Sequence, residues 1–192
     1  MTSKQSPLKD LLKTSLPAVI DLSSQPITWL IEAIFIGHLS AAALAGVGIS
    51  LQVVLLTFAI LLTFVMGASI IILRYLGVED SWNANHVLAQ ALMIGTILAF
   101  IIGLFWYFGA TQLMYIIRED EPVARRYAVE WLQTASYFAP IFIVNFIALG
   151  ILRMAGDTLL NMRINLIANA IHILLLPLFV FGNFGFPRLE AQ

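Results

Sequence analysis

The fold is decided by the stretch DLSSQPITWLIE (residues 21–32), which lies within a longer apolar run. Its polar side chains recur at offsets of 4, 7 and 11 residues from Asp21. At 3.6 residues per turn, these offsets place Asp21, Gln25, Thr28 and Glu32 on one stripe of a helix. A carboxylate at the centre of a membrane helix costs about 3 kcal/mol or more. The sequence therefore predicts a membrane helix whose polar stripe faces a bundle interior or a water-filled cavity.

The composition supports a membrane protein. Of the 192 residues, 60% are hydrophobic and 11% are charged, whereas soluble domains carry roughly 25% charged residues. The formal net charge of −1 argues against nucleic acid as a partner. The absence of cysteine excludes disulfides and thiolate metal sites.

Motifs of enzymes are absent from the sequence. It contains no Gly-rich phosphate loop with its lysine, no nucleophile elbow, and no His and acid spacing typical of a metal site. We therefore predict neither an enzyme nor a bound cofactor or metal.

The distribution of apolar residues predicts an all-α membrane protein with five spans. Each span needs about 20 mostly apolar residues, and polar or glycine-containing breaks separate the runs. Residues 1–15 carry lysines and are predicted to form a cytoplasmic N-terminal segment, followed by a first span that is retained rather than cleaved. The predicted spans are 16–36, 42–73, 87–117, 131–152 and 161–182.

The distribution of basic residues favours a cytoplasmic N-terminus. Positive residues collect on the cytoplasmic side of membrane proteins. With the N-terminus inside, that side holds six of the ten, namely Lys4, Lys9, Lys13, Arg74, Arg153 and Arg163. The opposite side holds Arg118, Arg125, Arg126 and Arg188.

The fifth span carries a second polar stripe. Asn161, Asn165, Asn169 and His172 recur at offsets of 4, 8 and 11 residues. Such side chains either form hydrogen bonds between helices or line a hydrated path, and the sequence leaves both readings open. An imidazole titrates near neutral pH, so His172 is also a candidate for a proton-linked role.

The two acids of the first span have competing interpretations. Asp21 and Glu32 lie near opposite ends of the span, where an acid can reach the interface instead of the interior. An acid held within the membrane is a candidate functional group. We treat both as candidates.

Several motifs resemble the multidrug and toxic compound extrusion (MATE) transporters. The resemblance covers about residues 15–190 with order and spacing preserved. Its motifs are LPA (16–18), EAIFIGHL (32–39), ALAGVG (43–48), LRMAGDT (152–158), LIAN (166–169) and PLFVFG (177–182).

This resemblance implies cation-coupled efflux, driven by protons or sodium, of small organic and often cationic compounds. Family members have about twelve helices in two six-helix lobes, related as parallel repeats are. Residues 16–190 are then expected to be an incomplete N-terminal lobe. We expect an N-terminal fragment that is inactive alone, with a separate C-terminal lobe as a candidate partner, in the bacterial inner membrane.

The resemblance also implies roles for residues of both stripes. The family's first-helix acid, which binds or senses the coupling ion, corresponds to Glu32, although Ala33 replaces the usual Thr. Where the fifth helix often has Asn and Asp four residues apart, this chain has His172 and Leu176. The expected coupling-ion residues are Glu32, His172 and Asp21, and the expected substrate-cavity residues are Gln25, Thr28, Asn165 and Asn169.

Two other functions remain open at this point. A non-transporting membrane protein would use the polar stripes only to associate with other helices. A flippase for lipid-linked precursors, from the same superfamily, would be expected to carry a strongly cationic cavity, for which the spans supply little basic charge.

Overall fold

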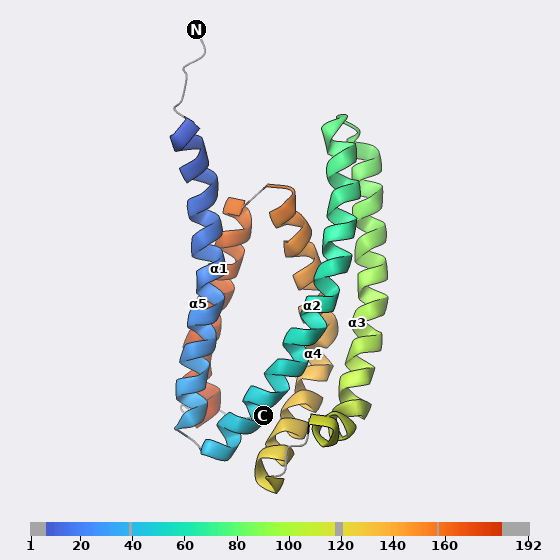
Figure 1. Cartoon of the computed structure of the whole chain (residues 1–192). Coiled ribbons are helices and arrows are strands. Elements are labelled where there is room, and N and C mark those ends of the chain that lie inside the picture. The colour runs from blue at the N-terminus through green and yellow to red at the C-terminus, as the bar shows by residue number, and fades with distance from the viewer. Residues whose placement is uncertain (1–6, 39, 118–120, 157, 182–192) are drawn as a thin grey trace.

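The computed structural model describes residues 7–38, 40–117, 121–156 and 158–181. These residues form five helices (Figure 1). Their bounds are α1 Pro7–Gly37, α2 Ala41–Gly77, α3 Ser81–Ile117, α4 Pro122–Met154 and α5 Thr158–Phe181. All five are long and apolar enough to cross a membrane, which confirms the predicted fold class.

The helices are longer than the predicted spans. The polar segment expected between the second and third predicted spans, 42–73 and 87–117, is wrong in its length. In the structure α2 continues to Gly77 and α3 begins at Ser81. Likewise α4 begins at Pro122, and α1 begins at Pro7 within the segment expected to precede the membrane. Hydropathy locates the apolar part of a helix, whereas polar residues can extend the same helix beyond it. Residues 1–6 of the expected N-terminal segment and residues 182–190 of the expected partial lobe lie outside the described residues, as do residues 118–120.

Local signals explain where two of these helices begin. The Ser40 hydroxyl accepts a hydrogen bond from the Ala43 backbone N–H (3.0 Å), which caps α2. The Asp80 carboxylate accepts one from the Asn83 backbone N–H (3.1 Å) at the start of α3. Such caps replace the intrahelical partners that the first turn of a helix lacks.

Helices α2, α3 and α4 form a tightly packed bundle, the α2–α3–α4 bundle, in which α4 packs against both others. Small side chains allow the close approach, as is typical of membrane helices. The Ser50 hydroxyl also donates to the Ala128 carbonyl (2.8 Å) between α2 and α4. The main buried cluster comprises Leu61, Val65, Ile72, Ala84, Ala91, Ala99, Trp106, Ala110, Met114, Ala128, Leu132, Ala139, Ile143, Ile147 and Ile151.

Gly46 lies where the backbones of α2 and α4 approach closely, and its replacement tests this packing. A Cβ at Gly46 would lie 2.5 Å from the Ala124 carbonyl oxygen, which belongs to the backbone and cannot rotate away. We expect Gly46→Ala to reduce the free energy of unfolding by about 1–3 kcal/mol through overpacking. The matched control is Gly48→Ala, because a Cβ at Gly48 meets nothing within 4 Å. Thermal unfolding in detergent should show a lower midpoint for the first variant, and equal midpoints would contradict the proposed close contact.

Helices α1 and α5 form a separate pair, although they are the first and last helices described. Figure 1 shows them side by side (blue and red), with the α2–α3–α4 bundle beside them. Near the α1–α2 connection, the buried residues Ile36, Ala43 and Val47 pack with Tyr127 and Trp131 of α4. The α1–α5 pair is therefore attached to the bundle by apolar contacts at one end.

Candidate functional site: the polar interface of α1 and α5

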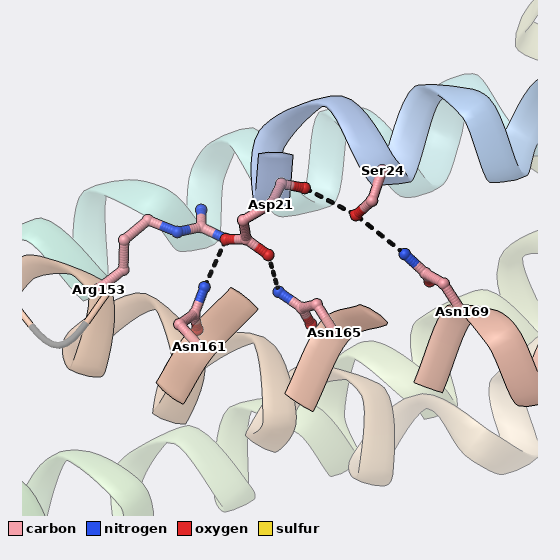
Figure 2. A network of polar contacts seen from close by, with 6 residues as sticks. All are labelled: Asp21, Ser24, Arg153, Asn161, Asn165 and Asn169. Carbon is pink, nitrogen blue, oxygen red and sulfur yellow. Dashed lines mark hydrogen bonds and ion pairs between the residues drawn. The ribbon is translucent and has the colours of Figure 1, made fainter. Parts of the chain in front are cut away.

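Asp21, near the middle of α1, is the centre of a polar network that lies at the start of α5. The residue is only 4% exposed. Its Oδ2 accepts hydrogen bonds from the Arg153 guanidinium (2.8 Å) and the Asn161 amide (2.5 Å), and its Oδ1 accepts one from the Asn165 amide (2.6 Å; Figure 2). We call these four residues the Asp21 cluster. Because the acceptor is a carboxylate, these bonds are shorter and stronger than those between neutral groups.

A second contact lies farther along the two helices. The Asn169 amide donates to the Ser24 hydroxyl (3.1 Å), and this hydroxyl donates to the Asp21 backbone carbonyl (2.8 Å; Figure 2). The Thr28 hydroxyl donates within α1 to the Ser24 carbonyl (3.0 Å). Ser24 thus links the polar face of α5 to the backbone of α1.

The third contact pairs an acid with an imidazole. His172 Nε2 lies 2.6 Å from Glu32 Oε1. The histidine side chain is 48% exposed and the glutamate side chain 23% exposed, so this contact is more open than that of Asp21. Glu32 follows Asp21 by 11 residues, which separates the two sites by about 16 Å along α1. A carboxyl and an imidazole at this distance can hold a proton between them and release it from an accessible position.

The structure brings most of the predicted residues together. Asp21 meets Asn161 and Asn165, and Glu32 meets His172, so the two stripes do face each other. The burial of Asp21 excludes the interpretation of an acid that extends to the interface.

Two residues of the first stripe, Gln25 and Thr28, take no part in these contacts. Gln25 is exposed and lies outside the contacts between α1 and α5 described above, so its place in a substrate cavity stays a prediction. Ser24, one residue earlier, contacts α5 instead, because contact between two helices alternates between spacings of three and four residues. Thr28 is buried, but its hydroxyl bonds within its own helix.

Sequence reasoning missed two partners, Arg153 and Ser24. Arg153 was counted as a charge at the end of a span, although it forms an ion pair with Asp21. An unpaired acid within an apolar run was the available signal, since buried charges require partners. Among the described residues, no group of three or more His, Cys, Asp or Glu side chains is placed to hold a metal ion.

Comparison with known families identifies this arrangement of helices. The MatE family model matches residues 17–178. The chain belongs to the MATE family. The matched region includes both polar stripes and all three contacts between α1 and α5.

The curated relatives of this MATE chain carry different names. It is 29% identical over 191 residues to the probable multidrug resistance protein NorM of Thermotoga maritima, covering 96% of the chain and 39% of that relative. It is also 29% identical over 191 residues to the FAD transporter of Shewanella oneidensis, covering 95% of the chain and 40% of that relative.

Solved structures agree with this assignment. A MOP superfamily transporter from Pyrococcus furiosus superposes with a TM-score of 0.84 at 26% identity, covering 98% of the chain and 41% of that structure. An outward-facing multidrug resistance MATE transporter gives 0.83 at 26% identity, with 98% and 42% coverage. The chain thus spans about two-fifths of the length of these relatives. It belongs to a family of transporters, not of enzymes, and is an integral membrane protein with five candidate spans.

Proposed function

We propose that this MATE chain contributes its helices to cation-coupled export of small organic compounds, with the coupling ion acting at Glu32 and His172. The observation that carries this proposal is their 2.6 Å contact. By resemblance, Glu32 corresponds to the coupling acid of the family, and its contact with His172 is less buried than the carboxylate of Asp21. Relatives named as multidrug resistance proteins support export as the function.

The chemistry of the pair favours a proton over sodium as the coupling ion. Sodium is held by oxygen atoms, whereas His172 directs a nitrogen at Glu32. An imidazole that accepts a proton repels a metal cation from the same carboxylate. Leu176 stands where the family often has an acid, and His172, which stands where the family often has Asn, supplies a side chain that can carry a proton.

The α1–α5 contacts also change the assignment of the cavity residues. The Asn165 and Asn169 side chains donate to α1 and so stabilise the helix interface, and the Thr28 hydroxyl already bonds within α1. Gln25 is exposed and keeps both its amide donor and acceptor for a ligand. We therefore retain Gln25 as the residue of this set that lines the substrate path.

The substrates that we propose are organic compounds, often cationic. One relative is named an FAD transporter, so the relatives also include a protein named for a dinucleotide substrate. A cationic cavity for a lipid-linked precursor is disfavoured here because Arg153 is already paired with Asp21. A bacterial plasma membrane with the N-terminus cytoplasmic remains our prediction for the location.

A membrane protein that only associates with other helices is the second candidate function. The satisfied contacts of Asn165 and Asn169 favour it, because they account for most of the second stripe without any ligand. Transport activity distinguishes the two functions.

The test compares the 192-residue chain with a protein in which it is joined to the remaining part of a MATE relative. We expect no drug efflux from the chain alone, because it spans about two-fifths of the length of its relatives. The joined protein should restore efflux, measured with a fluorescent dye in cells that lack other pumps. Efflux by the chain alone would contradict the need for further helices. A joined protein that reaches the membrane without exporting dye would favour the association function.

A further inference from the structure

The helices within the α2–α3–α4 bundle and within the α1–α5 pair are held together by different kinds of contact. The α2–α3–α4 bundle packs through small and apolar side chains, and α1 and α5 contact each other through polar ones. Near the α1–α2 connection, an apolar cluster attaches the pair to the bundle. At the opposite end, near the α4–α5 connection, Arg153 in the last turn of α4 contacts Asp21 of α1. Figure 2 shows Arg153 of α4 and Asn161 and Asn165 of α5 converging on the Asp21 carboxylate.

The Asp21–Arg153 contact is suited to opening, whereas the apolar cluster is not. The Arg153 side chain is 38% exposed, so water can solvate its guanidinium when the contact separates. Asp21 would keep its two amide donors on α5 and therefore remain hydrogen-bonded. Separation of Arg153 thus leaves the α1–α5 pair intact and removes one attachment to the bundle.

Two further features agree with a second arrangement at this end. Arg153 Nε and Asn161 Oδ1 are buried without a hydrogen-bond partner among the described residues. A buried group in this condition costs about 1–3 kcal/mol, and hydration after opening would remove that cost. The turn after α4 contains Gly156 at φ +96°, a conformation that favours glycine and allows α5 to change direction relative to α4.

We infer that the Asp21–Arg153 ion pair holds the α1–α5 pair against the end of α4, and that its opening lets α1 and α5 move together relative to the α2–α3–α4 bundle. Arg153 is then a positioning residue that acts through Asp21. The apolar cluster of Ile36, Ala43 and Val47 remains the fixed end of this motion. The inference concerns the chain itself and does not depend on transport activity.

Distances between spin labels test this motion directly. The sequence contains no cysteine, so Trp82→Cys on α3 and Ile167→Cys on α5 would carry two unique labels. Both positions are exposed, at 81% and 62%. In lipid nanodiscs containing the full 192-residue chain, we expect Arg153→Gln to increase the share of a longer distance population. Arg153→Lys, which keeps the positive charge, should remain close to the parent.

Controls separate this effect from general destabilisation. Arg74→Gln removes an exposed arginine from the last turn of α2, as Arg153 lies in the last turn of α4, and should leave the distances unchanged. Asp21→Asn also removes the ion pair and should increase the same population, and the double variant should show no further increase over Asp21→Asn. If Asp21→Asn fails to insert, the three arginine variants still decide the question.

Three outcomes would overturn the inference. They are an unchanged distance distribution in Arg153→Gln, an equal response in Arg74→Gln, and a lysine variant that behaves like the glutamine variant.

Discussion

Glu32→Gln is expected to abolish proton-driven dye efflux by the joined protein, reducing it to the level of cells without the transporter. Glutamine preserves the size of the side chain and a hydrogen bond to His172, but it cannot bind and release a proton. The hydrogen bond to His172 would persist, but protonation of the imidazole would no longer depend on the charge of residue 32. The measurement is dye efflux under an imposed pH gradient, with the amount of protein in the membrane determined in parallel.

The matched control is Glu130→Gln. Glu130 forms an exposed i,i+4 ion pair with Arg126 on α4, and such pairs contribute little. His172→Gln should reduce efflux less than Glu32→Gln, because the acid remains able to exchange a proton. Undiminished efflux by Glu32→Gln would remove this residue from the mechanism. Efflux that follows a sodium gradient and ignores the pH gradient would replace the proton with sodium.

Asp21→Ala is expected to cause the largest loss of stability among single substitutions in α1. It removes the acceptor shared by Arg153, Asn161 and Asn165. Removing one partner of a buried ion pair typically costs about 3–5 kcal/mol. Because the Arg153 side chain is 38% exposed, water recovers part of that loss, and we expect about 2–3 kcal/mol. Thermal unfolding of the purified chain in detergent measures it.

A double substitution separates the lost ion pair from the lost packing. Asp21→Leu with Arg153→Met removes both charges and leaves apolar side chains, which often restores stability in such pairs. We expect this variant to unfold at a higher temperature than Asp21→Ala. Ser23→Ala, on an exposed position of the same helix, is the control and should be nearly neutral. An Asp21→Ala variant as stable as the parent would show that the Asp21 cluster does not hold α1 and α5 together.

The membrane spans could be predicted because hydrophobicity and length are local properties of the sequence. The direction of the two stripes was also predictable, since a carboxylate such as Asp21 cannot face lipid without a large cost. Helix ends were less predictable, because caps such as Ser40 and Asp80 act outside the apolar run that defines a span. The length of α4 beyond its apolar part is the clearest example.

The partners of individual residues could not be predicted from the sequence. Arg153 and Asp21 are 132 positions apart, and helical periodicity carries no information about such pairs. The choice of Ser24 over Gln25 depends on how α1 rotates against α5, because the two residues lie on opposite sides of Asp21 around the helix, about 60° and about 40° from it. The rotation of α1 therefore decides that Ser24, and not Gln25, contacts Asn169.

The pairing of the first helix with the fifth has a consequence for biosynthesis. Asn161 follows Asp21 by 140 residues. At about 5–20 residues per second, α1 emerges roughly 7–28 s before this partner is synthesised. During this interval Asp21 and Glu32 of α1 have no α5 to contact, while α2, α3 and α4 emerge in sequence and can already pack together. The fifth helix thus completes the membrane insertion of the first, and translation that stops before α5 would leave α1 without the partner that Asp21 and Glu32 require.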